Sequence, residues 1–196
     1  MNSSLRYLIM LVGGLTISLV TSAQQYHHVS SSNQPYGSWN SESPVELKDY
    51  EPLIGSCDCK SVRRNPDGTW QDSIKMVWTF KYIMDGKAVM DETLKEDGGH
   101  SMSIRQYNAD SAKWYVTYFA ANSAAPSPGT WSGGKKGDDM VLYLPQKAPN
   151  GADGYARLTF YDISDEGYRW KGEWVDLNET VAFPFWTIDC SKTGNW

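Results

Sequence analysis

A run of strict alternation between residues 74 and 82 constrains the fold of this chain more than any other feature. Apolar side chains occupy every second position, from Ile74 at one end to Tyr82 at the other, and three of the four residues between them are Lys or Thr. Successive side chains of a β-strand face opposite ways, so a period of two is the period of a strand. The run therefore predicts a strand with one buried face and one largely wet face.

Similar short strand signals follow one another along the chain, separated by turn signals. Asp85-Gly86 is typical of a hairpin turn between the first clear strand and its partner. The expected strands begin near residue 54 and continue at 74–82, 87–94, 101–107, 113–119, 140–144, 155–163, 168–175 and 182–190, with a shorter one around Thr130-Trp131 inside a loop spanning 121–137. Regularly spaced strands of this kind indicate an antiparallel all-β sandwich or barrel.

The N-terminus has the pattern of an export signal. Arg6 precedes an apolar run over residues 8–20, and small residues at 21–23 offer a cleavage site before Gln24. The alternative is a membrane anchor, but the run is shorter than the roughly 20 residues that cross a bilayer. We therefore expect residues 1–23 to be a signal peptide, no membrane span after its removal, and a periplasmic or extracellular protein.

The residues after the signal divide into a leader and a folded domain. Residues 24–44 are rich in Ser, Asn and Gln without a hydrophobic period, which predicts a flexible leader outside the core. Residues 45–54 suit a short helical or extended lead-in, so the domain is expected over 45–196. The formal net charge is −5 before removal of the signal, which takes away only one positive charge. This acidity argues against nucleic acid or an anionic membrane surface as a partner.

Three cysteines bear on how the sheet closes. Cys57 and Cys59 share one face at the start of the first strand, and Cys190 ends the last strand. In an up-and-down barrel with an even number of strands these two places adjoin, and an oxidising compartment permits a disulfide. We expect Cys57 to pair with Cys190 and Cys59 to be free, although Cys59 can also reach, and three unbonded buried thiols are the other alternative.

Several short motifs together resemble a known family. They are Leu53-Ile54-Gly55, Trp78, Met84-Asp85-Gly86-Lys87-Ala88, Ile104-Arg105-Gln106-Tyr107-Asn108, Lys113-Trp114, Arg157-Leu158-Thr159-Phe160, Tyr168-Arg169-Trp170 and Trp186. In order and spacing, over residues 48–191, this series is similar to uncharacterised bacterial lipocalin-like (calycin) domains. The resemblance implies a barrel of about eight to ten strands with an internal cavity, and no established activity.

Two departures from related patterns matter. Cys57 stands where lipocalin-like proteins often have the tryptophan of a Gly-x-Trp motif. The chain also lacks the Gly-rich motif and the late His of haem-binding, nitrobindin-like barrels. We therefore expect no haem, and the sequence predicts no other cofactor.

A barrel of this size holds its own side chains or one small ligand. The aromatic candidates for a ligand-binding lining are Trp78, Phe80, Trp114, Tyr118, Trp170 and Trp174, which would otherwise simply fill the core. Arg105 and Arg157 interrupt apolar or small-residue strands, and a buried guanidinium needs a carboxylate or ligand oxygens. Glu92 and Glu173 are candidate internal partners. The alternative is that both arginines point outward or form structural ion pairs.

The catalytic inventory is thin. His27 and His28 fall in the leader, and His100 lies in a Gly-Gly turn with no second His nearby. Asp91 and Glu92 are adjacent on a strand and so face opposite ways. We therefore predict no catalytic residue and no metal site.

The function that these observations favour is exported binding of a small apolar or amphipathic molecule, with the oligomeric state left open. A carbohydrate-binding module with Trp131 as an exposed ring is one alternative. A small hydrolase or isomerase using an unrecognised acid/base pair, with Glu92 or Glu173 as candidates, is another.

Overall fold

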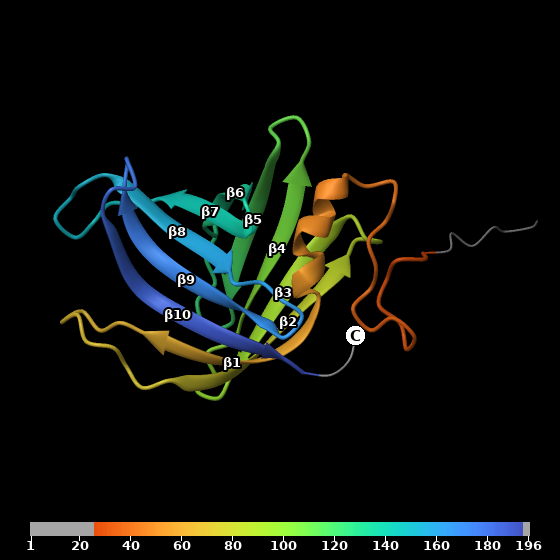
Figure 1. The fold of residues 1–196 in the computed structure, drawn as a ribbon, viewed down its shortest axis with the longest axis horizontal. Coiled ribbons are helices and arrows are strands. Elements are labelled where there is room, and N and C mark those ends of the chain that lie inside the picture. The colour runs from red at the N-terminus through yellow and green to blue at the C-terminus, as the bar shows by residue number, and fades with distance from the viewer. Residues whose placement is uncertain (1–25, 194–196) are drawn as a thin grey trace, which may run out of the picture.

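Ten antiparallel strands close into one barrel in the computed structural model, which describes residues 26–193 (Figure 1). The strands are β1 (Gly55–Arg63), β2 (Ile74–Ile83), β3 (Ala88–Lys95), β4 (Ser101–Asn108), β5 (Lys113–Ala120), β6 (Thr130–Lys136), β7 (Asp139–Pro145), β8 (Gly154–Tyr161), β9 (Gly167–Asp176) and β10 (Ala182–Lys192). Each pairs with its neighbours in chain order, and β1 pairs with β10 to complete the ring. The predicted all-β, antiparallel barrel is confirmed. The expected signal peptide, residues 1–23, lies outside the described residues.

The disulfide that joins the first and last strands involves Cys59. In the β1–β10 register Cys59 lies directly opposite Cys190, with their Cα atoms 4.1 Å apart, and the two sulfurs are bonded. Cys57 faces the same way but lies opposite Lys192, two positions further along the ladder. The predicted Cys57–Cys190 pair is therefore wrong, because the strand register selects Cys59. Cys57 and Cys59 share one face, so their face alone does not reveal the register. Cys57 is a buried free thiol whose pKa is raised by burial.

A short 3₁₀ helix, η1 (Val45–Leu53), lies against one end of the barrel (Figure 1). Its Leu47, Tyr50 and Leu53 side chains are buried, and the Tyr50 ring meets Trp114 of β5 edge-on with the ring centroids 4.7 Å apart. The lead-in that the sequence left open as helical or extended is thus helical. The aromatic core around Tyr50 fills this end of the barrel and leaves room only toward the other.

Residues 26–44, whose composition predicts a flexible leader, dock onto the β2–β3 hairpin. Asn40 is 5% exposed, and its side-chain amide donates to the backbone carbonyl of Asp85. A Cβ at Gly86 would lie 2.4 Å from the Ser38 carbonyl oxygen, so the hairpin turn needs glycine for this approach. Backbone hydrogen bonds and one buried amide hold the segment, which a reading of hydrophobic periodicity does not detect.

Within residues 26–193, no helix combines the length and the apolar character that crossing a membrane requires.

Candidate ligand-binding site

The half of the barrel away from η1 encloses a cavity of about 420 Å³. Pockets that take small molecules in proteins range from roughly 300 to 1,000 Å³. Its walls come from side chains on alternate positions of the strands, which is the period that the sequence shows most clearly between residues 74 and 82. The cavity is therefore a direct consequence of closing these strands into a ring.

One wall of the cavity is polar. It is formed where β3 pairs with β4, with Asp91 opposite Ser103 and Thr93 opposite Ser101. The Thr93 and Ser101 hydroxyl oxygens lie 2.6 Å apart and share a hydrogen bond. Arg105, two residues beyond Ser103 on β4, continues this wall toward η1.

The facing wall is apolar and comes from β7 to β10. Its members are Leu142, Ala156, Leu158, Phe160, Trp170 and Ile188. On β8 the three lining residues alternate at positions 156, 158 and 160, while Arg157 and Thr159 face away from the cavity. A molecule in the cavity would meet hydroxyl and charged groups on one side and hydrocarbon and aromatic rings on the other.

A buried ion pair forms the inner end of the cavity. Arg105 Nη1 donates to Asp91 Oδ1, and Trp78 Nε1 donates to Asp91 Oδ2 at 2.7 Å. The Arg105 and Asp91 side chains are only 3% and 4% exposed. Three neighbouring strands, β2, β3 and β4, thus place an indole, a carboxylate and a guanidinium in one hydrogen-bonded group.

Aromatic rings surround this guanidinium on the η1 side. Its Cζ lies 4.9 Å from the Phe80 ring centroid and 5.1 Å from that of Tyr50, which are favourable distances for cation–π attraction. Burial acts to lower the pKa of Arg105, but the Asp91 carboxylate outweighs it and the pKa is raised. Burial also raises the pKa of the Tyr50 phenol to about 12. Both groups therefore keep one protonation state across ordinary pH.

Four of the eight residues predicted for a ligand site line the cavity: Trp78, Arg105, Tyr118 and Trp170. Phe80 is fully buried behind Trp78 and Arg105. Trp114 is also on the inner face of its strand, but it lies at the η1 end, where its Nε1 donates to Asp49. The Trp174 indole donates to the backbone carbonyl of Gln146 and does not line the cavity.

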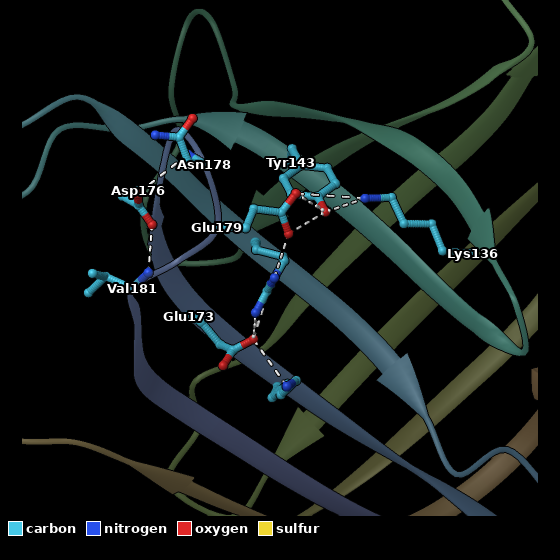
Figure 2. A network of polar contacts seen from close by, with 9 residues as sticks. Lys136, Tyr143, Glu173, Asp176, Asn178, Glu179 and Val181 are labelled. Atoms are coloured by element: carbon cyan, nitrogen blue, oxygen red, sulfur yellow. Dashed lines mark hydrogen bonds and ion pairs between the residues drawn. The ribbon is translucent and has the colours of Figure 1, made fainter.

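Arg157, the eighth candidate, belongs to a polar cluster on the outer face of β7–β9. Figure 2 shows other members of this cluster, Tyr143, Glu173 and Glu179. Its Nη2 lies 2.8 Å from a Glu173 oxygen and its Nη1 lies 2.6 Å from a Glu179 oxygen. Tyr143 donates to Glu179 and accepts a hydrogen bond from Lys136. Arg157 therefore takes the outward, ion-paired position that was the alternative to a ligand anchor.

The two carboxylates considered for acid/base chemistry also lie off the cavity lining. Glu92 is exposed on the outer face of β3. Glu173 is held by Arg157 and by Lys171, whose Nζ is 3.2 Å from Glu173 Oε2. Among residues 26–193, no three His, Cys, Asp or Glu side chains are grouped as metal ligands would be.

The most informative residues that sequence reasoning missed are two tryptophans and an aspartate. The carbohydrate-binding alternative needs Trp131 as an exposed ring. Trp131 instead lies in β6, where a short strand is expected, and lines the cavity half-buried, with no hydrogen-bond partner for its Nε1 among the described residues. Trp186 lines the cavity from β10, and its Nε1 donates to Ser61 at 2.7 Å. Asp91 shares the inner face of β3 with Thr93. The alternation of residues 91 and 93 in the sequence could have predicted this.

A second, more polar hollow of about 410 Å³ adjoins the cavity at the open end of the barrel. Arg63 and Tyr118 line both spaces and so lie at their junction. Lys95 and His100 line the second space alone. We refer to the first space as the inner cavity and to the second as the rim compartment.

Comparisons with known proteins give the fold. No protein-family model matches the chain, and no curated protein sequence does. Among solved structures, the chain is similar to Rv2717c from M. tuberculosis, with a TM-score of 0.51 and 12% identity over 77% of this chain and 99% of that one. It is also similar to the S-type phycobiliprotein lyase CPES from Guillardia theta, with a TM-score of 0.47 and 10% identity over 78% of this chain and 99% of that one. At such identities the likeness concerns the barrel alone.

Proposed function

We propose that this protein binds one small amphipathic molecule inside its barrel. The observation that carries the proposal is the two-sided inner cavity, with hydroxyl and charged groups on β3–β4 facing apolar side chains on β7–β10. Ligand sites of proteins are mostly apolar, with a few fixed polar groups that orient the ligand. An apolar body would lie against Leu158 and Ile188, and polar atoms would face Ser103 and Thr93.

The interior polar groups favour binding over mere packing. A barrel that only needed a core would gain more from apolar side chains at these positions, because buried polar groups are costly unless bonded. Here the Trp131 Nε1 and the Arg105 Nε are buried without hydrogen-bond partners among the described residues, and both residues line the cavity. A bound molecule with acceptor atoms would satisfy such donors.

The proposal is tested with 1-N-phenylnaphthylamine, an uncharged apolar fluorophore. Trp78, Trp131, Trp170 and Trp186 all line the inner cavity, so a bound probe should quench tryptophan emission. We expect saturable binding of one probe per chain. Ala156, 3% exposed on the apolar wall, offers a way to fill the cavity from within.

The decisive comparison is between two tryptophan substitutions. Ala156→Trp should weaken probe binding about tenfold or more, since the new ring occupies the space of the ligand. Ala109→Trp adds the same ring to the exposed β4–β5 turn and should leave binding unchanged. Circular dichroism verifies that both variants keep the barrel. Absence of saturable binding, or equal binding by the Ala156→Trp variant, would overturn the proposal.

We also infer that the protein acts in an oxidising compartment after export. The Cys59–Cys190 disulfide supports this, since structural disulfides persist mainly outside the reducing cytosol. The N-terminal sequence of the protein purified from its natural source tests the inference. A chain beginning at Gln24 is expected, and a mature chain that retains Arg6 would contradict it.

A further inference from the structure

Two cationic side chains meet one tryptophan where the rim compartment joins the inner cavity. The Arg63 guanidinium carbon lies 4.0 Å from the Trp186 ring centroid, and the Lys95 ammonium nitrogen lies 4.7 Å from it. Arg63 and Trp186 are direct neighbours across the β1–β10 ladder, while Lys95 reaches the ring from the end of β3. The ends of β1 and β3, on either side of β2, therefore direct positive charge to one place.

Lys95 is the unusual member of this group. The residue is only 8% exposed, yet its ammonium group makes no ion pair or hydrogen bond within the part of the chain that the structure describes. Lysine with so little exposed surface is usually paired. The ammonium nitrogen of Lys95 is not fully removed from solvent, and the residue lines the rim compartment. Burial lowers the pKa of Lys95, and the charge of Arg63 lowers it further.

The acidic groups nearby do not fill this role. Asp72 and Asp97 line the rim compartment, but both are exposed and neither comes within 4.0 Å of a nitrogen of Lys95 or Arg63. Asp97 raises the pKa of Lys95, but less than burial and Arg63 lower it, and its Oδ1 accepts a hydrogen bond from the backbone of Gly99. His100 also lines the compartment and is exposed. The site therefore has an open position for an anion next to the Lys95 ammonium group.

We propose that Lys95 and Arg63 bind the anionic group of the ligand, a carboxylate or a phosphate, at Trp186. This inference rests on the proposed function and narrows it to acidic amphipathic molecules. The apolar body would lie in the inner cavity, and the acidic group would pass the junction formed by Arg63 and Tyr118 to reach Lys95. Arg105 is the weaker candidate for this role, because its charge is already balanced by Asp91.

A matched pair of probes separates charge recognition from cavity binding. 8-Anilinonaphthalene-1-sulfonate has the ring system of 1-N-phenylnaphthylamine and adds one sulfonate. Titrations of both probes into the protein at pH 7 are compared with titrations into the Lys95→Met variant, which keeps the length and apolar stem of the side chain. The Lys60→Met variant removes one exposed positive charge from the outer face of β1 and controls for net charge. Lys95→Arg keeps the charge at the site.

The proposal predicts a selective loss. Lys95→Met should weaken binding of the sulfonate probe about tenfold or more, and leave that of the uncharged probe within about twofold. Lys60→Met should change neither, and Lys95→Arg should retain most of the preference for the sulfonate. Displacement of the sulfonate probe by octanoate and by octyl phosphate, but not by 1-octanol, then ranks the two anionic groups.

The outcomes distinguish the two proposals. If Lys95→Met weakens binding of both probes equally, or of neither, the anion site is overturned and the cavity proposal stands. Failure of both probes to bind the unmodified protein overturns the cavity proposal, and the anion site with it.

Discussion

The buried pair between Arg105 and Asp91 gives a sharp test of how the cavity is built. Replacing Asp91 with Asn keeps a side-chain oxygen that can accept the hydrogen bond of Trp78, but removes the counter-charge of Arg105. Both side chains of the pair are less than 5% exposed, so solvent compensates poorly for the lost partner. Removal of one member of such a pair costs about 3–5 kcal/mol. Asp91→Asn should therefore lower the free energy of unfolding by about that amount.

A double-mutant cycle shows whether the pair itself is responsible. Arg105→Met should destabilise the protein on its own. Among the described residues it leaves the buried Asp91 carboxylate with Trp78 as its one remaining hydrogen-bond donor. The double variant Asp91→Asn/Arg105→Met removes both charges. Its loss of stability should be smaller than the sum of the two single losses by about 2 kcal/mol or more. Glu92→Gln, on the exposed face of the same strand, should change stability by less than about 0.5 kcal/mol.

The assay is urea unfolding at pH 7 followed by far-ultraviolet circular dichroism, which does not depend on the tryptophans near the pair. If Asp91→Asn costs no more than Glu92→Gln, or if the two costs add without coupling, the pair is not the buried, mutually dependent group described above.

Two further predictions follow from the closure of the barrel and from its η1 end. Cys59→Ala removes a link between residues 131 positions apart. In the chain-entropy model this lowers the free energy of unfolding by up to about 5 kcal/mol, and unfolding should become insensitive to dithiothreitol. Cys57→Ala should keep the sensitivity to dithiothreitol; loss of that sensitivity in Cys57→Ala but not in Cys59→Ala would contradict the pairing. The Tyr50 phenol has a folded-state pKa of about 12 against 10.0 in the unfolded chain, so its stabilising contribution is complete below pH 10 and is lost as the pH rises toward 12. Between pH 10 and 12 the free energy of unfolding of the Tyr50→Phe variant should therefore fall by about 3 kcal/mol less than that of the unmodified protein. Urea unfolding at several pH values measures this difference, and equal falls in both proteins would refute the reasoning.

Strand positions were the part of the fold that the sequence predicted well. The alternation from Ile74 to Tyr82 became β2, and the expected segments correspond to the ten observed strands. β6 (Thr130–Lys136) is the exception, since it is longer than the short strand expected around Thr130-Trp131. Its Gly133 and Gly134 carry no periodic side chains, so the hydrophobic pattern gives no signal there.

Register and depth were the parts that a single sequence does not contain. Cys57 and Cys59 have the same parity, and only the pairing of β1 with β10 distinguishes them. Trp114 and Tyr118 lie on one face of β5, yet one is beneath η1 and the other lines the cavity, because position along the barrel axis depends on the tilt of all ten strands. Arg157 shows the remaining ambiguity, since polar and apolar residues do not alternate cleanly around it.

The rim group was also invisible to sequence reasoning. Lys95 and Arg63 are distant in sequence, and nothing at the end of the expected strand 87–94 signals that Lys95 is buried. Only the closed ring brings both to Trp186. Long-range pairing therefore decides the part of the site that most narrows the ligand.

The most direct test of the central claim is native mass spectrometry of the protein purified gently from its natural source. The account predicts one small molecule per chain, containing an acidic group and released when the protein is denatured. A complex formed with 8-anilinonaphthalene-1-sulfonate shows that bound ligand survives the measurement. A bare polypeptide mass under conditions where that complex persists would contradict the claim that the barrel carries a ligand.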